Sequence, residues 1–300
     1  MAKDLSMSLD NTMDIYKIYA NMNTTASEIQ QTAKPTAILS NLSSVDASTA
    51  ADQVQGILQQ FHMLEDGSTT AADASMHIVD VLDKVSGSVG IDYAKGIKLF
   101  LMLYRLPVRL LMMQVCPYEQ LAAITAKVSE RTREDGSSIG NALKTIITRT
   151  TKVGKMPQYA DEVDNATLSN ASASLHAIGV DVYNPDGSDR GIITVMSELK
   201  DKWDDLTNAQ QNKIAFDVAA TRQTSKFKSM LDAFTDSMSL AEEATTANGN
   251  AEANQEKYME STAGKLQAIK TQMQDFWVNF YNSGTVNGVL EFVHSLTEGF

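Results

Sequence analysis

The chain has 300 residues, of which 37 are acidic and 25 are basic, and its formal net charge is −12. This acidity argues against an autonomous nucleic-acid-binding protein, which would have a basic surface. The single cysteine, Cys116, excludes an intramolecular disulfide framework and any zinc site with several cysteine ligands. Aromatic residues make up only 7% of the chain, a composition typical of helical, surface-rich proteins and not of dense α/β enzyme cores.

Hydrophobic residues recur with a helical period in the first part of the chain. One stripe consists of Val54, Ile57, Leu58 and Phe61, and the next consists of Ile78, Val79, Leu82, Val85 and Val89. Residues with this spacing lie on one face of a helix, so each stripe predicts an amphipathic helix. Asp46 or Ser48 would cap the first of these helices.

Two more helical stripes lie close together and predict an αα-hairpin. They consist of Leu121, Ile124 and Val128, and of Ile139, Leu143, Ile146 and Ile147. The first helix is expected to end near residues 134–136, and Ser137 or Ser138 is expected to begin the second. A loop over residues 152–160 and a helix over about 161–178 are expected to follow.

One short β signal interrupts the helices. Val180, Val182 and Tyr183 precede the turn sequence Asn184-Pro185-Asp186-Gly187-Ser188, and Ile192-Ile193-Thr194-Val195 follows it. Pro-Asp-Gly is strong turn chemistry, and short apolar segments on both sides of such a turn are typical of strands. The sequence therefore predicts a small β-hairpin at residues 180–195.

Helical periodicity resumes after this turn. The apolar positions are Val195, Leu199, Trp203 and Leu206, then Ile214 and Val218, then Phe227, Met230, Leu231 and Phe234. They predict three successive helices. Thr207, with Gln210 three residues later, matches the capping box that begins a helix.

The last helical signal has a heptad spacing. It follows the polar residues 244–256, which predict a linker or an exposed helix end. Its apolar residues are Leu266, Ile269, Met273, Phe276 and Phe280, with Trp277 beside them. This pattern predicts a short helix near 258–281 and permits a coiled coil. We therefore expect an all-α protein with one small hairpin, divided into a helical core over 1–245 and a linker with the start of a coiled-coil-like helix over 246–300.

Residue types used in catalysis and metal binding are present without a recognisable arrangement. The histidines His62, His77, His176 and His294 have no metal-binding spacing, and Cys116 has no accompanying His or Asn signature. The adjacent acid pairs and the isolated glycines match no site either: Asp204-Asp205, Glu242-Glu243, Gly87, Gly90 and Gly96. The sequence therefore predicts no catalytic, cofactor-binding or metal-binding residues, and no enzyme activity.

Several segments occur together in an order that resembles a known family. They are residues 13–20, 35–41, 118–121, 128–146, 202–206 and 221–223. Their order and spacing resemble the N-terminal conserved core of phage tail tape measure proteins, chiefly of long-tailed phages and prophages of Gram-positive bacteria. The resemblance runs from about residue 10 to about residue 280, and it is most specific from Gly136 to Ile146.

The resemblance implies a structural, non-enzymatic component of the virion tail. Tape measure proteins of this kind are largely helical, lie in the lumen of the tail tube, template its polymerisation and leave it ahead of the DNA. The implied partners are the tail tube protein, tail assembly chaperones in the host cytoplasm, distal tail and baseplate proteins, and further copies of the chain in the tube lumen. The resemblance implies no cofactor, no sequence-specific nucleic acid and no membrane contact by this region. Because family members are commonly longer, we expect the chain to be part of a longer reading frame.

Two other functional classes stay open. One is a soluble helical interaction or chaperone-like module without catalysis, which the acidity and the amphipathic helices would fit. The other is a tail-associated muralytic enzyme, which the lack of a catalytic constellation disfavours.

Residues 99–117 depart from the family pattern. They read LFLMLYRLPVRLLMMQVCP, where the family has a polar, Gly- and Ala-rich amphipathic segment. A shifted reading frame would permit AISDALQATGSVAYDAGLS, so we expect a compensated frameshift or a sequencing error. The alternative is a buried apolar helix broken at Pro107.

Overall fold

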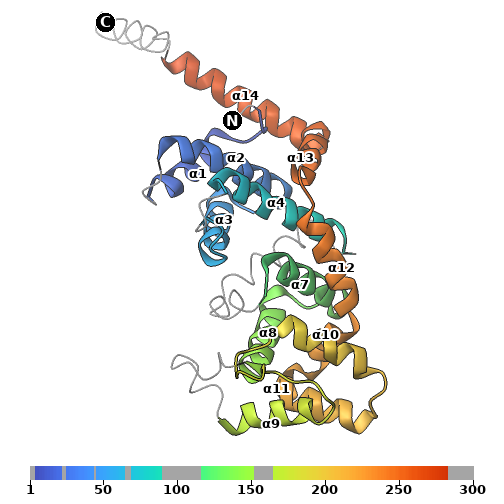
Figure 1. Cartoon of the computed structure of the whole chain (residues 1–300). Helices are drawn as coiled ribbons and strands as arrows, with labels where there is room; N and C mark the ends of the chain where they lie inside the picture. Colours follow the sequence, from blue (N-terminus) through green and yellow to red (C-terminus); the bar gives the residue numbers. More distant parts are fainter. Residues whose placement is uncertain are drawn as a thin grey trace, which may run out of the picture. The chain divides into compact units, whose positions relative to one another are not determined.

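The structure is a computed structural model that describes residues 4–21, 25–43, 45–64, 69–89, 116–151 and 165–282. All regular elements among these residues are α-helices, which confirms the predicted all-α class (Figure 1). In chain order they are α1 (Leu9–Asn21), α2 (Ala26–Ser43), α3 (Ala47–Gln60), α4 (Ala71–Gly87), α7 (Tyr118–Thr132), α8 (Gly136–Thr150), α9 (Asn165–His176), α10 (Ile192–Trp203), α11 (Asn208–Asp232), α12 (Phe234–Thr245), α13 (Asn250–Glu260) and α14 (Thr262–Asn282).

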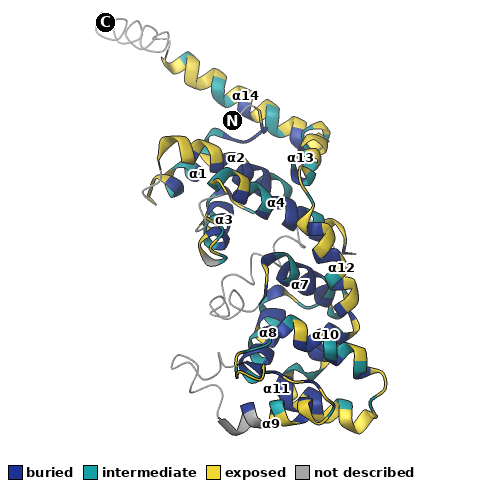
Figure 2. Cartoon of the chain, viewed as in Figure 1, coloured by how far each residue is buried: buried dark blue, intermediate teal, exposed yellow. Residues whose placement is uncertain are grey.

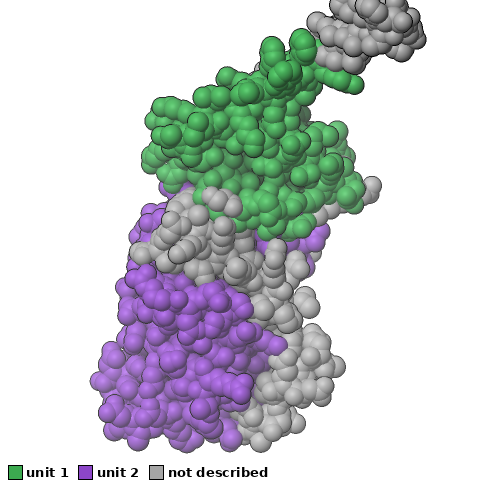
Figure 3. All heavy atoms as spheres, turned by 180° about the vertical axis from the view of Figure 1, so that it is seen from behind, with its two compact units in different colours: residues 1–52, 251–300 green, residues 53–250 purple. Residues whose placement is uncertain are grey.

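The chain divides into two compact units, coloured separately in Figure 3. Unit 1 consists of residues 1–52 and 251–300, and unit 2 consists of residues 53–250. Unit 1 joins two distant parts of the sequence, because α1 contacts both α2 and α14. One break between the units falls after Asn250, close to the predicted boundary. The division into 1–245 and 246–300 stays a prediction.

Unit 2 is built around one hydrophobic core, seen as dark blue segments in Figure 2. Helix α7 contacts α4 and α12, and α8 contacts α9 and α11. The predicted stripes on α7 and α8 are buried in this core, which confirms the αα-hairpin. Trp203 on α10 meets Phe227 on α11 edge to face, with ring centroids 6.0 Å apart. The predicted stripes on α3 and α4 are also buried from Val54 to Leu58 and from Ile78 to Val89.

The predicted β-hairpin at 180–195 is wrong. The turn forms, since the Gly187 amide donates to the Asn184 carbonyl over 2.8 Å, but pairing stops at an isolated bridge between Tyr183 and Asp189. Gly191, with a φ of 79°, redirects the chain, and α10 begins at the next residue. The supposed second strand is the first turn of α10, because Ile192 continues the stripe of Val195, Leu199 and Trp203 and is buried with it, whereas Ile193 is only partly buried. Burial of this stripe therefore favours the helical period over the short alternating one.

Helix α11 joins two of the predicted helices. It begins at the predicted capping box, where the Gln210 amide donates to Thr207 Oγ1 over 3.3 Å and the Thr207 amide donates to Gln210 Oε1 over 3.0 Å. The helix is kinked at Ala220, whose φ of 55° and ψ of 168° are non-helical. The kink separates the stripe of Ile214 and Val218 from the stripe that begins at Phe227.

In unit 1, helices α1 and α2 pack against each other. Tyr19 on α1 is buried, and its hydroxyl lies 2.6 Å from Thr36 Oγ1 on α2. Helix α2 begins at a second capping box, in which the Glu28 amide donates to Thr25 Oγ1 and the Thr25 amide donates to Glu28 Oε2.

The polar residues 244–256 are only partly a linker. Helix α12 ends at Thr245, Gly249 has a φ of 77° in the following turn, and α13 begins at Asn250. Helix α14 confirms the helix predicted near 258–281, and the coiled coil stays a prediction. At its start, Ser261 Oγ accepts a hydrogen bond from the Gly264 amide over 3.1 Å.

Some predictions lie outside the described residues. They are the loop at 152–160, the first residues of the helix expected over about 161–178, Gly90, Gly96, His294, and residues 99–115 of the apolar segment. The two described residues of that segment are Cys116, which is buried in the core of unit 2, and Pro117, which precedes α7. Among the described helices, none combines the length and the hydropathy needed to cross a lipid bilayer.

Candidate functional site

Cys116 lies in the hydrophobic core and is 4% exposed. Burial, together with the nearby Glu119 carboxylate, raises the pKa of its thiol to about 12. Reactive cysteines have the opposite property, a lowered pKa and access to solvent. The Cys116 side chain therefore acts in packing.

The described histidines occupy separate places. His77 Nε2 lies 2.8 Å from Glu119 Oε1, so this pair joins α4 to α7. His176, the exposed last residue of α9, has its Nδ1 2.6 Å from Asp181 Oδ1, and His62 lies in the turn after α3. In the described part of the chain, no group of three His, Cys, Asp or Glu side chains could hold a metal ion.

One adjacent acid pair, Glu242-Glu243, lies on helix α12, and the other, Asp204-Asp205, lies in the turn that follows α10. Glu243 on α12 pairs with Lys84 on α4 at 2.9 Å, and Asp204 pairs with Lys200 one turn earlier at 3.3 Å. Exposed pairs of this kind contribute little to stability. Their geometry does not bring two carboxylates onto one substrate position.

A polar cluster that the sequence did not reveal lies between α9 and α11. Lys213 Nζ donates to Asp217 Oδ2 over 2.6 Å and to Ser174 Oγ over 3.0 Å, and the Ser174 hydroxyl also donates to Asp217 Oδ2. Arg149 Nη1 donates to the Asp217 carbonyl over 3.2 Å. These hydrogen bonds give each side chain of the cluster a partner, and they join α8, α9 and α11 next to the kink at Ala220. No local sequence signal predicts it, because Ser174 and Asp217 are far apart in the chain.

The turn between α7 and α8 is defined by a left-handed residue and a side-chain helix cap. Arg133 ends α7 in the left-handed conformation, with a φ of 59°. Asp135 then caps α8 by accepting a hydrogen bond from the Ser138 amide over 2.8 Å. The predicted serine caps are therefore wrong: a carboxylate two or three residues earlier takes that role and complements the positive end of the helix dipole.

Glu134 connects this turn to the rest of unit 2. It accepts a hydrogen bond from Ser138 Oγ, and its Oε2 lies 2.9 Å from Nζ of Lys226 on α11. The Ser138 hydroxyl and then the Lys226 ammonium hold the pKa of Glu134 below its ordinary value. Asp135 and Glu134 thus stabilise the turn between α7 and α8 and attach it to α11.

Residues 116–219, which contain this turn, match the family model of phage-related minor tail proteins. This match supports a phage tail protein. It covers α7 to α10 and the part of α11 before the kink at Ala220, and it suggests a component of the virion tail. No solved structure matches the chain.

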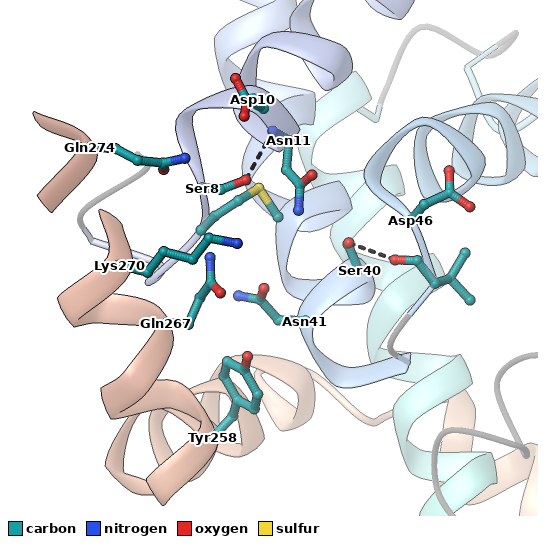
Figure 4. A pocket seen from close by; sticks show the side chains of 12 residues that line it. Ser8, Asp10, Asn11, Ser40, Asn41, Asp46, Tyr258, Gln267, Lys270 and Gln274 are labelled. Carbon is teal, nitrogen blue, oxygen red and sulfur yellow. Dashed lines mark hydrogen bonds between the residues drawn. The ribbon is translucent and has the colours of Figure 1, made fainter. Parts of the chain in front are cut away.

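Unit 1 contains a polar pocket of about 470 Å³. Figure 4 shows it between the N-terminal segment, the end of α2 and the helices α13 and α14. Its lining is mostly hydroxyl and amide groups, with Lys270 and the carboxylates of Asp10 and Asp46. Hydrogen bonds within the wall, such as that from Ser40 Oγ to the Val45 carbonyl at 2.7 Å, use part of this polarity.

Proposed function

We propose that this chain is the N-terminal core of a phage tail tape measure protein. It templates assembly of the tail tube, sets the tail length and leaves the tube ahead of the DNA on infection. Its partners are the tail tube protein, the tail assembly chaperones, and distal tail and baseplate proteins. It does this without catalysis, cofactor or metal.

One observation carries the proposal. Segment 136–146, the most specific part of the resemblance to tape measure proteins, lies inside residues 116–219 that match the minor tail protein family. Both similarities thus point to the phage tail at the same helical hairpin. The helical composition is compatible with a ruler, because a fully helical chain of 300 residues could span at most about 450 Å.

The test is tail length in a phage that carries this gene. Early termination of the gene should abolish tails or give tubes of uncontrolled length in electron micrographs. Inserting about 28 residues of helical heptads in frame should lengthen the tail by about 42 Å, at 1.5 Å per residue. A non-helical insertion of equal length is the control for the gain in tail length per inserted residue. Tails of normal, unchanged length after both the early termination and the heptad insertion would contradict a role in setting tail length.

A helical interaction module is the second candidate, favoured by the exposed apolar face of α14, on which Leu266, Ile269 and Phe276 are each more than half exposed. It would leave tail length independent of the length of the gene. A muralytic enzyme is tested with the purified chain on a peptidoglycan gel, where we expect no clearing. Clearing that a His77 or Cys116 substitution abolished would overturn the non-enzymatic assignment.

A further inference from the structure

The turn between α12 and α13 contains the dipeptide Asn248-Gly249. Asn248 is exposed, and its side chain makes no hydrogen bond in the part of the chain that the structure describes. Gly249 has a φ of 77°, and a Cβ atom at this position would meet nothing within 4 Å. The Asn248 side chain is therefore open to solvent, next to a glycine in the left-handed conformation that this residue type favours.

Asparagine followed by glycine undergoes a characteristic reaction in water. The glycine amide nitrogen loses its proton and attacks the side-chain amide carbon of the asparagine. A new N–C bond forms, the C–NH₂ bond breaks, and ammonia leaves with a proton that replaces the one lost from the glycine nitrogen. Water then opens the cyclic succinimide at either carbonyl and gives aspartate or isoaspartate. Glycine favours this reaction, because it has no side chain to hinder the approach of its nitrogen.

In the folded chain, helix α4 holds the nitrogen that would attack. The Gly249 amide donates a hydrogen bond to Asp80 Oδ2 over 2.9 Å, and Asp80 is buried. The side-chain amide of Asn250 donates to Oδ2 of Asp83, almost one helical turn further along α4. Helix α12, which ends just before this turn, also packs on α4 (Figure 1). Two carboxylates of α4 therefore anchor the turn.

The hydrogen bond to Asp80 opposes the first step of the reaction. The Gly249 amide proton must leave before the nitrogen can attack, and a buried, hydrogen-bonded proton becomes accessible only when the contact opens. The Asp80 carboxylate also raises the energy of the amide anion, because two negative charges would then lie side by side away from water. Asn248 is therefore kept unreacted for as long as the turn is docked on α4.

We propose that Asn248 is a deamidation site that becomes reactive when its turn detaches from α4, and that the reaction makes this detachment irreversible. Aspartate or isoaspartate at position 248 adds a negative charge near the Asp80 and Asp83 carboxylates, which repel it. Isoaspartate also lengthens the backbone before the Gly249 amide. Both changes oppose the return of that amide to Asp80. This property goes beyond the tape measure role and does not depend on it.

The experiment follows deamidation of the full chain by mass spectrometry during incubation at mildly alkaline pH. The tryptic peptide 229–257 contains Asn248, whereas Asn287, which also precedes a glycine, falls in another peptide. Fragmentation distinguishes Asn248 from Asn250 and Asn254. A synthetic peptide of residues 244–254 is the reference, because it contains the dipeptide without α4. We expect Asn248 to react at least about tenfold more slowly in the chain than in this peptide, since the reaction requires local opening.

Asp80→Ala tests the anchor. It should raise the deamidation rate of Asn248 in the chain at least about fivefold, because the Gly249 amide loses its acceptor. The control Asp201→Ala removes an exposed carboxylate on α10 and should leave this rate unchanged. Circular dichroism checks that both variants keep their helices. If Asp80→Ala does not fold, hydrogen exchange of the Gly249 amide in the wild type decides, because exchange begins with loss of the same proton and should be slowed relative to the peptide.

A third variant tests irreversibility. Asn248→Asp introduces the charge of the reaction product, and it should speed hydrogen exchange of the Gly249 amide. Asn208→Asp adds the same charge at an exposed position on α11 and should leave this exchange unchanged.

Three results would overturn the inference. They are equal deamidation rates in the chain and the peptide, an unchanged rate in a folded Asp80→Ala variant, and a Gly249 amide that exchanges as fast in the wild type as in the peptide. An Asn248→Asp variant that exchanged like the wild type would refute the irreversible step. Because none of these measurements involves tail length, their failure would leave the tape measure role standing.

Discussion

Lys226 on α11 lies 2.9 Å from the Glu134 carboxylate in the turn between α7 and α8, although the two residues are far apart in the sequence. Its side chain is only 11% exposed. The ammonium group therefore lies mostly out of water, and Glu134 compensates its charge. This pair fixes the helical turn to α11.

Removing this ammonium group should weaken unit 2. We expect Lys226→Met to lower the free energy of unfolding by about 1–2 kcal/mol, because a hydrogen bond to a charged group is lost. Urea denaturation followed by circular dichroism would measure it. Arg131→Ala, which breaks the nearby exposed pair with Asp236, is the control and should change stability by less than about 0.5 kcal/mol. Equal effects of the two substitutions would contradict the role of Lys226.

The kink in α11 places Ala220 in a backbone conformation that favours glycine. Because only glycine adopts it without strain, Ala220→Gly should stabilise the protein by about 1 kcal/mol. The neighbouring Ala219 is buried and helical, and Ala219→Gly should destabilise it by about 1 kcal/mol. The midpoints of thermal unfolding of the two variants should shift in opposite directions. A loss of stability in Ala220→Gly would show that the backbone at Ala220 is not strained.

Gly264 allows α13 and α14 to approach closely. A Cβ atom at this position would lie 2.1 Å from the Tyr258 carbonyl oxygen and 2.8 Å from the Met259 Cα. Both are backbone atoms, so Gly264→Ala should cost more than about 2 kcal/mol despite the better helix propensity of alanine. Gly87→Ala is the matched control, because a Cβ there meets nothing within 4 Å, and it should be neutral or slightly stabilising. Comparable unfolding midpoints for the two variants would be inconsistent with this packing.

Asp46 caps α3 and gives unit 1 a pH dependence. Hydrogen bonds from Ser48 Oγ and then from the Thr49 amide lower the pKa of its carboxyl group from 3.8 to about 2. We expect Asp46→Ala to cost about 1 kcal/mol at pH 7. Because the pKa is lower in the folded state, this contribution is fully present above the unfolded-state pKa and is lost as the pH falls through about 2.

Denaturation of both proteins from pH 7 downward measures this difference, and it should shrink below about pH 4. Asp46→Asn retains an acceptor at the cap and should cost less at pH 7. A difference between the wild type and Asp46→Ala that did not change with pH would show that the carboxylate charge has no part in the cap.

Local sequence patterns determined the helices and most of the buried faces. The stripes on α4, α7 and α8 and the capping box at Thr207 depend on residues within one or two helical turns, so their spacing alone specifies them. Competition between two local signals explains the false hairpin: the turn at Gly187 was real, but the burial of Ile192 with Val195 and Leu199 decided for helix.

Only the tertiary structure decided which residues meet across the chain. The bonds of Ser174 with Lys213 and Asp217, and the pair of Lys226 with Glu134, join residues whose separation gives no periodic signal. The heptad spacing of α14 predicted a helix, but not that the polar Thr271 would face Met7 of the N-terminal segment. Nor did it predict that Leu266, Ile269 and Phe276 would be left exposed. Periodicity defines the two faces of a helix, whereas the neighbours available for packing and hydrogen bonding decide which face is buried.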